Sequence, residues 1–210
     1  MIRILLVDDH AVVRLGLRQA LTDTIAGAVF EEAGSAEEAL SLVRTLTFDI
    51  VILDIALPGE SGLDALKKIK QICPGLPVLI LSVYAEEEFA VRTLRAGASG
   101  YVTKKAASTE LAEAVRRIVA GGRYVTAAVA EKLADEVQRG AALSPHERLS
   151  DREYQVFRLL GMGKSVTQAA EELSLSVQTI STYRTRILEK MGMSSNADLV
   201  EYVFRNRPSP

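Results

Sequence analysis

The feature of this chain that most limits its possible folds is an alternation of two sequence patterns along its first part. Short runs rich in β-branched residues alternate with segments in which apolar residues recur at helical spacing; the runs lie at Ile2–Val7, Ile50–Leu53 and Val78–Leu81, with weaker ones near Val29 and Tyr101. Five strand–helix repeats indicate βαβ units, which right-handed crossovers assemble into a doubly wound sheet with helices on both faces. We therefore predict an α/β domain with a five-stranded parallel sheet.

Local signals support the predicted helices and strands. Val12, Leu15 and Leu21 have helical spacing after the first strand. Ser35 and Ser108 each stand before an acidic first turn, which is typical of a helix N-cap. Because the three strongest runs are almost continuously apolar, we expect them to be central strands buried on both sides.

The alternation stops after residue 122, and the rest of the chain has no strand pattern. Residues 127–138 predict one further helix, and Gly140 to Leu149, with Ser144-Pro145, has the composition of a linker. Four short helices are expected beyond it, near 151–162, 166–173, 177–191 and 196–205. The predicted organisation is an α/β domain over 1–122, a linker with a helix over 123–148, and a small all-α domain over 149–210.

Composition excludes several classes of protein. With 48% hydrophobic and 25% charged residues the chain is neither disordered nor collagen-like, and a net charge of −2 is too small to identify a partner. The single cysteine, Cys73, cannot form an internal disulfide or a cysteine metal cluster. The N-terminal run leads into Asp8-Asp9 like a strand rather than a signal peptide, and no apolar run reaches the ~20 residues of a membrane span. We expect a cytoplasmic protein without a membrane partner.

Polar residues follow the predicted strands at the edge where parallel sheets bind ligands. Asp8 and Asp9 follow the first strand, Asp54 the third, Ser82 the fourth and Lys104 the fifth. If the first and third strands are neighbours, three carboxylates converge, which is unfavourable without a cation. Hard oxygen ligands that stay partly hydrated suit Mg²⁺, whose site is often completed by a phosphate.

The same edge offers groups that could hold a phosphoryl group on one of the carboxylates. Aspartate is a covalent phosphate acceptor, and Lys104 and Ser82 supply a positive charge and a hydroxyl. Each residue also has an ordinary explanation: Asp8-Asp9 as an N-cap pair for the first helix, Asp54 as a loop cap, Lys104 as a solvated lysine. Their joint position at the strand ends of one sheet is the more specific signal.

Four segments of this region resemble the receiver domain of two-component response regulators, over residues 1–122. They are Val7-Asp8-Asp9-His10, Ile52-Leu53-Asp54-Ile55-Ala56-Leu57-Pro58-Gly59 with Ser61-Gly62, Leu81-Ser82, and Gly97-Ala98-Ser99-Gly100-Tyr101-Val102-Thr103-Lys104. The resemblance implies a flavodoxin-like fold and phosphorylation of Asp54 by a sensor histidine kinase. Two positions depart from the pattern: Lys105 stands where proline or aspartate is commoner, and Leu57 replaces a frequent methionine.

The resemblance also implies roles for individual residues. Asp9, Asp54 and the backbone carbonyl of Ala56 would ligate Mg²⁺, with Asp8 acting partly through water. Lys104 would pair with the phosphoryl oxygens, so that Asp54, Lys104 and Ser82 form the catalytic set. Ser82 and Tyr101 would be the switch pair, in which the hydroxyl turns toward the phosphoryl group and the aromatic ring follows inward.

The C-terminal segment has the pattern of a helix-turn-helix. Ser150-Asp151-Arg152-Glu153 is a capping box, Val166–Leu173 a short helix, and Val177–Met191 a longer helix that begins after Ser176 and ends at Gly192. We expect the longer helix to bury Val177, Ile180, Ile187, Leu188 and Met191. Its other face carries hydrogen-bond donors and cations suited to base edges and phosphates, or is simply a solvated face: Gln178, Thr179, Ser181, Thr182, Arg184, Thr185, Arg186 and Lys190.

Residues 148–206 resemble the LuxR-type helix-turn-helix of the NarL/FixJ group. The likeness lies in Leu149-Ser150-Asp151-Arg152-Glu153, Ala169-Ala170-Glu171-Glu172-Leu173, Ser176-Val177-Gln178-Thr179-Ile180 and Ile187-Leu188-Glu189-Lys190-Met191-Gly192. It implies that Ser181, Thr182 and Thr185 face the major groove, and that Arg184, Arg186 and Lys190 reach bases or phosphates. The sequence departs from the group at Tyr183, Ala169 and Asn196, where histidine, isoleucine and arginine are common.

Together these patterns predict a DNA-binding transcriptional regulator, activated when Asp54 is phosphorylated. Phosphorylation would promote a homodimer on double-stranded promoter DNA, since symmetric sites match two-fold dimers. We expect helix 196–205, with Leu199, Val200, Val203 and Phe204, either to supply a dimer contact or to pack on helix 151–162. Removing Lys190 should flatten the salt dependence of DNA binding.

Three other functions are weaker. Magnesium-dependent phosphatases with an aspartyl nucleophile carry a second carboxylate two residues on, and Ala56 stands there, so we expect catalysis only of the protein's own phosphorylation and dephosphorylation. An unphosphorylated docking module would not need Asp8, Asp9, Asp54 and Lys104 together. The segment Gly161-Met162-Gly163-Lys164-Ser165 lacks the first glycine of a phosphate-binding loop, because Arg158 stands there.

Overall fold

A computed structural model describes residues 1–57, 61–83, 87–139 and 145–205 of the chain. The chain forms two compact units, Met1–Gly140 and Ala141–Pro210. Within the described residues, no helix combines the length and the apolar character that crossing a membrane requires.

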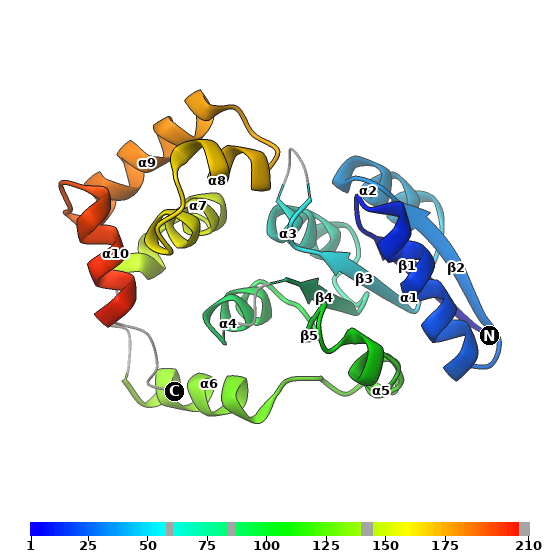
Figure 1. Cartoon of the computed structure of the whole chain (residues 1–210). Coiled ribbons are helices and arrows are strands. Elements are labelled where there is room, and N and C mark those ends of the chain that lie inside the picture. Colours follow the sequence, from blue (N-terminus) through cyan, green and yellow to red (C-terminus); the bar gives the residue numbers. More distant parts are fainter. Residues whose placement is uncertain (58–60, 84–86, 140–144, 206–210) are drawn as a thin grey trace. The chain divides into compact units, whose positions relative to one another are not determined.

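The first unit is the predicted five-stranded parallel sheet with helices on both faces (Figure 1). The strand order is β2-β1-β3-β4-β5. Its elements alternate along the chain as β1 (Ile2–Val7), α1 (Ala11–Thr24), β2 (Ala28–Ala33), α2 (Ala36–Thr45), β3 (Ile50–Asp54), α3 (Gly62–Ile72), β4 (Val78–Ser82), α4 (Glu87–Arg95), β5 (Gly100–Thr103), α5 (Ala107–Val119) and α6 (Ala127–Arg139).

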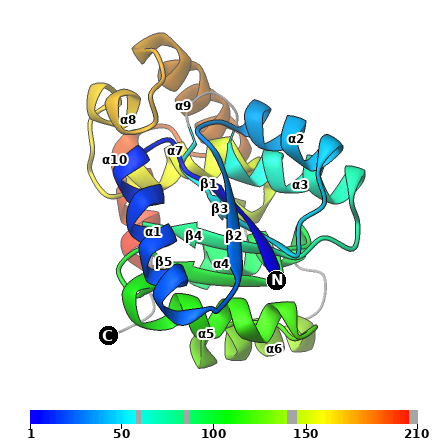
Figure 2. The same ribbon diagram turned by 90° about the vertical axis from the view of Figure 1, so that its right-hand side faces the viewer.

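Alternate residues of the central strands divide between the two faces of the sheet. One face packs against α1 and α5, through a core that includes Ile4, Ile52, Leu81, Leu21 and Leu111. Helices α2 and α3 lie on the opposite face (Figure 2). β3 and β4 are buried along their whole length, as the continuous apolar runs predicted, whereas the two weaker runs form the edge strands β2 and β5.

One local expectation about the helices of this unit is wrong. Helix α5 begins at Ala107 with Ala106 as its N-cap, so Ser108 is not the N-cap. A turn before the helix is closed by the Ala106 amide, which donates to the Thr103 carbonyl at 3.0 Å. The helix predicted from the spacing of Val12, Leu15 and Leu21 is confirmed as α1, in which Leu21 is buried whereas Val12 is 82% exposed and Leu15 58%. The N-cap at Ser35 is confirmed, since its side chain accepts a hydrogen bond from the Glu38 amide.

The second unit is helical, with the short and longer helices of the predicted helix-turn-helix in sequence. After the 3-10 turn η1 (Pro145–Arg148) come α7 (Asp151–Gly161), α8 (Val166–Glu172), α9 (Val177–Met191) and α10 (Asn196–Arg205). The capping box at Ser150, the N-cap at Ser176 and the helix end at Gly192, whose φ is 67°, are confirmed. Ser165 and Gln168 form a second capping box, at the start of α8, that the sequence analysis missed.

The packing of α9 and α10 corrects one expectation and resolves another. Val177 is exposed rather than buried, because it is the first residue of α9 and the end of the helix is less covered by the rest of the unit. The other four predicted residues are buried: Ile180, Ile187, Leu188 and Met191. Helix α10 packs on α7 through buried Leu199 and Val203, beside Gly161, where a Cβ would overlap the Val203 side chain. Val200 and Phe204, on the same helix, remain exposed.

Candidate functional site

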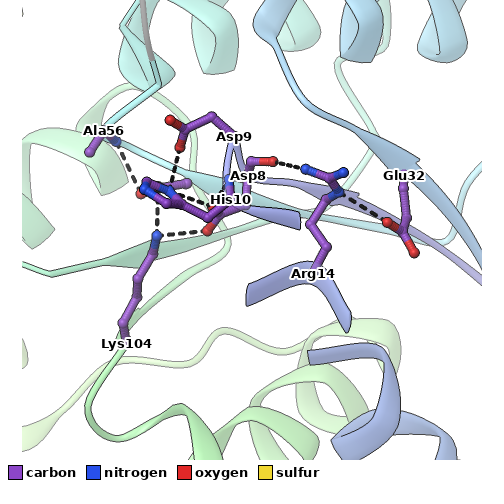
Figure 3. A network of polar contacts seen from close by, with 8 residues as sticks. Asp8, Asp9, His10, Arg14, Glu32, Ala56 and Lys104 are labelled. Carbon is purple, nitrogen blue, oxygen red and sulfur yellow. Dashed lines mark hydrogen bonds and ion pairs between the residues drawn. The ribbon is translucent and has the colours of Figure 1, made fainter. Parts of the chain in front are cut away.

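The polar residues at the strand ends meet at one edge of the sheet (Figure 3). Asp8 directly follows β1, Asp54 is the last residue of β3, and Lys104 directly follows β5. They come together because parallel strands in register end at the same edge: Val7 pairs with Leu53, and Asp54 with Leu81. Asp8 and Asp54 are each only 1% exposed, so both carboxylates are almost fully shielded from water.

Lys104 joins these two carboxylates. Its Nζ lies 2.7 Å from Asp54 Oδ2 and 2.6 Å from Asp8 Oδ2. Burial alone would lower the pKa of Lys104, but its ion pair and hydrogen bond with Asp54, and then those with Asp8, outweigh burial and raise that pKa. The ammonium therefore stays charged and opposes the repulsion between the two acids.

Asp54 is fixed by the backbone as well as by Lys104. Its Oδ1 accepts a hydrogen bond from the Ala56 amide at 3.0 Å, while Oδ2 faces the lysine. Burial raises the pKa of the Asp54 carboxyl, and the opposing effect of Lys104 offsets this only in part. An ionised carboxylate in such a place gains strongly from any further positive charge.

Asp9 and His10 lie next to Asp8 on the loop that follows β1. Within the described part of the chain, the ligand atoms of Asp8, Asp9 and His10 all lie within 4.8 Å of one another. His10 Nδ1 is 2.8 Å from Asp9 Oδ1, and the His10 amide donates to Asp8 Oδ1 at 2.9 Å. Asp8 Oδ2, which faces Lys104, and Asp9 Oδ1, which faces His10, are both buried oxygens. Such oxygens fit a hard divalent cation, so the donor set suits Mg²⁺.

An ion pair between Arg14 and Glu32, which the sequence did not reveal, supports the loop that carries Asp8. Arg14 of α1 donates from Nη1 to the Asp8 carbonyl at 2.5 Å and from Nε to Glu32 Oε2 at 3.0 Å (Figure 3). Glu32 lies on β2, beside β1, where its partner in register is Leu6. No sequence signal joins Arg14 to Glu32, because the contact depends on how α1 crosses the sheet edge.

Ser82 and Tyr101 lie on neighbouring strands at the same side of the sheet. Ser82 is the last residue of β4 and fully buried, and Tyr101 of β5 is also buried. The carbonyl of Ser82 accepts a hydrogen bond from the Lys104 amide at 2.6 Å, which ties the end of β4 to the lysine. The switch role of this pair stays a prediction.

The candidate DNA-contacting residues of α9 lie outside its set of buried side chains, although they do not all share one face. Most are exposed, and Thr179 and Arg184 are partly buried; the full set is Gln178, Thr179, Ser181, Thr182, Arg184, Thr185, Arg186 and Lys190. Three hydroxyls of this set donate to backbone carbonyls one turn earlier, so their oxygens are left to accept hydrogen bonds: those of Ser181, Thr182 and Thr185. Arg184 Nε donates to Asn196 Oδ1 at 2.6 Å, which fixes its guanidinium group.

Lys190 has a structural partner that the sequence did not reveal. Its Nζ lies 2.6 Å from Oε2 of Glu153, whose side chain is only 4% exposed. The same carboxylate accepts the Ser150 amide in the α7 capping box. Burial opposes ionisation of Glu153, but the hydrogen bonds from Lys190 and Ser150 outweigh burial and lower its pKa.

We therefore expect Lys190→Ala to act mainly on stability. Removing the ammonium leaves a buried carboxylate without this cation and should lower the free energy of unfolding by about 1 kcal/mol. Because the pKa of Glu153 is lowered in the folded state, the loss should be present above its ordinary value and disappear as the pH falls through the lowered one. Urea unfolding at neutral and acidic pH measures this. Arg186→Ala is the matched control: if Lys190→Ala flattens the salt dependence of DNA binding more than Arg186→Ala does, Lys190 acts on phosphates instead.

The Gly-Lys-Ser segment has a structural role in the second unit. Ser165 is the N-cap of α8, and Lys164 is ion-paired with Glu172. The segment lies between two helices and does not follow a strand, so it lacks the setting of a phosphate-binding loop.

Comparisons with known proteins cover both units. Residues 4–116 match the model of the response regulator receiver domain, and residues 147–203 match that of the bacterial regulatory proteins of the luxR family. The response regulator GacA of Pseudomonas viridiflava is 38% identical over 207 residues, 98% of this chain and 97% of the relative. The response regulator UvrY of Escherichia coli K12 is 34% identical, over 98% of this chain and 95% of the relative.

Solved structures are similar over one or both units. A LuxR-family two-component response regulator from Aurantimonas is 40% identical with a TM-score of 0.60, covering 66% of this chain and 99% of that chain. The response regulator RcsB in complex with DNA is 25% identical with a TM-score of 0.59, covering 98% of this chain and 99% of that chain.

Proposed function

This chain belongs to the two-component response regulators that join a receiver domain to a LuxR-type DNA-binding domain, and on this premise we propose that phosphorylation of Asp54 controls its binding to promoter DNA. It is a DNA-binding transcriptional regulator. The observation that carries the proposal is the contact of one ammonium group with two buried carboxylates, Lys104 with Asp54 and Asp8.

The proposed reaction is phosphoryl transfer from a phosphohistidine of a sensor kinase. An Asp54 carboxylate oxygen forms the new P–O bond as the P–N bond breaks, and the electron pair and a proton remain with the histidine. Asp54 Oδ1 is already engaged by the Ala56 amide, and Lys104 lies beside Oδ2, where it can neutralise charge on the transferred group. Ser82, buried at the end of β4, would be the hydroxyl that turns toward the phosphoryl group.

Mg²⁺ would be held by Asp9, Asp54 and the Ala56 carbonyl, with Asp8 partly through water. When bound, it would neutralise negative charge between the carboxylates and the phosphoryl oxygens. The buried carboxylate oxygens of Asp8 and Asp9, which lie side by side at the end of β1, support this assignment.

We expect Arg14→Ala to weaken Mg²⁺ binding about tenfold, because it removes the support of the Asp8 carbonyl. Glu32→Gln, which keeps Arg14 but loses its anchor, should have a smaller effect in the same direction. Isothermal titration with MgCl₂ measures both, with Arg18→Ala as a control, since Arg18 contacts the same Glu32 at 3.6 Å and is half exposed. Equal affinities in Arg14→Ala and wild type would contradict a positioning role.

In the second unit, α9 would enter the major groove. Ser181, Thr182 and Thr185 would face base edges, and Arg184 and Arg186 would reach bases or phosphates, with Gln178, Thr179 and Lys190 on the same helix. Phosphorylation would favour a homodimer, for which exposed Val200 and Phe204 on α10 are candidate contacts. The site of action would be the cytoplasm, and the receiver would catalyse only its own phosphorylation and dephosphorylation.

The test compares DNA binding and dimerisation of wild type and Asp54→Ala, with and without acetyl phosphate and Mg²⁺. We expect a gain in both properties that needs acetyl phosphate, Mg²⁺ and Asp54 together. Equal binding by both proteins under all conditions would favour the unphosphorylated docking module.

A further inference from the structure

The edge of the sheet beyond β5 is occupied by a residue from the segment between α5 and α6. The Tyr101 amide donates to the Tyr124 carbonyl at 3.1 Å, and the Tyr124 amide donates to the Ser99 carbonyl at 3.1 Å. Gly100 leaves room for this approach, because a Cβ there would lie 2.7 Å from the Tyr124 carbonyl oxygen. The segment that leaves the sheet is thus bonded to Tyr101, the proposed switch residue.

The side chain of Tyr124 anchors the same segment to α5. Its hydroxyl donates to Glu110 Oε2 at 3.1 Å, and its ring packs against the core between the sheet and α5. Burial, together with the Glu110 carboxylate, raises the pKa of Tyr124 to about 12, so the hydroxyl remains a donor at neutral pH. Backbone and side chain therefore hold Tyr124 to two different elements.

Helix α6 starts three residues after Tyr124 and packs against α4 (Figure 1). The Thr126 hydroxyl accepts a hydrogen bond from the Val129 amide at its first turn, and Val129 is buried. Helix α4 in turn contacts β5. The segment 124–139 is thus attached both to β5, through Tyr124, and to α4, through α6.

We propose that Tyr124 is a positioning residue that transmits the state of Tyr101 and α4 to α6, and so to the chain that leads into the DNA-binding unit. The inference rests on the proposed function: Tyr124 and α6 would carry the effect of phosphorylation from β5 and α4 toward the DNA-binding unit. Phosphorylation would change the free energy with which β5 and α4 bind Tyr124 and α6. That free-energy difference is the coupling between the two units.

The test uses the full chain, acetyl phosphate, Mg²⁺, and a DNA duplex that the phosphorylated wild-type protein selects from a random-sequence pool. For each variant, the extent of Asp54 phosphorylation and the ratio of DNA dissociation constants without and with acetyl phosphate are measured. We expect Tyr124→Ala to lower that ratio about fivefold or more at unchanged phosphorylation. Tyr124→Phe, which keeps the ring and loses the Glu110 bond, should restore most of it. Glu113→Gln, an exposed neighbour on α5, should match wild type.

The outcomes separate the two proposals. A wild-type ratio of one would overturn the proposed function, whereas a wild-type ratio above one that is unchanged in Tyr124→Ala would overturn only this inference. Amide hydrogen exchange of wild type decides the matter should Tyr124→Ala fail to fold. A change in protection across 124–139 on phosphorylation supports the inference, and identical protection with and without acetyl phosphate overturns it.

Discussion

Lys104→Ala is expected to remove nearly all phosphorylation of Asp54, and with it the gain in DNA binding, while the fold remains intact. The variant leaves two buried carboxylates, Asp8 and Asp54, without the ammonium group that contacts both. The pKa of Asp54, already raised by burial, should rise further, so the ionised nucleophile is lost at a higher pH than in wild type. A phosphoryl group on Asp54 would also lack its positive partner. We expect the rate of phosphorylation by acetyl phosphate to fall about 100-fold or more.

Lys105→Ala is the matched control, because Lys105 is the exposed neighbour on the same turn. It should be phosphorylated like wild type. The rate for each protein is measured across the acidic pH range, and DNA affinity is measured in parallel. Wild-type rates in Lys104→Ala would show that the lysine has no part in the chemistry.

Gly62→Ala should produce the largest loss of stability. Gly62 is the first residue of α3, and its amide donates to the Ile55 carbonyl at 3.1 Å. An added Cβ would overlap the Asp54 carbonyl oxygen and lie 2.6 Å from Ile55 Cα. Since these atoms belong to the backbone at the end of a buried strand, they cannot move aside as a flexible side chain could. We expect a loss of about 3 kcal/mol in the free energy of unfolding, with displacement of Asp54.

Chemical denaturation compares this variant with Gly16→Ala. Gly16 lies within α1, and an added Cβ there has no atom within 4 Å, so alanine should stabilise the helix by about 1 kcal/mol. An unfolding midpoint for Gly62→Ala at or above that of wild type would contradict the packing at the end of β3.

The sequence was sufficient to predict the fold of the first unit and the group of charges at its edge. Both follow from one regularity: parallel strands end at the same edge, so Asp8, Asp54 and Lys104 had to meet once the strands were located. The central strands gave strong signals because both their faces are buried. β2 gave a weak one because it is an edge strand that is mostly only partly buried, and β5 because it has only four residues and begins with Gly100.

Contacts between distant elements could not be predicted in the same way. Arg14 with Glu32, Lys190 with Glu153, and Tyr124 with β5 join residues whose sequence separation carries no periodic signal. The wrong expectation for Val177 has a related cause: helical spacing identifies an apolar side chain but not how much of the helix the rest of the protein covers. Ser108 was misplaced because an earlier turn, at Ala106, already begins α5.

The central claim is that Asp54 accepts the phosphoryl group, and the most direct test is to locate that group. The full chain is incubated with acetyl phosphate and Mg²⁺, the acyl phosphate is trapped by borohydride reduction, and the digest is sequenced by mass spectrometry. Modification at Asp54, and neither at Asp8 nor at Asp9, is the predicted result. A folded protein modified at another residue instead, or left unmodified, would contradict it.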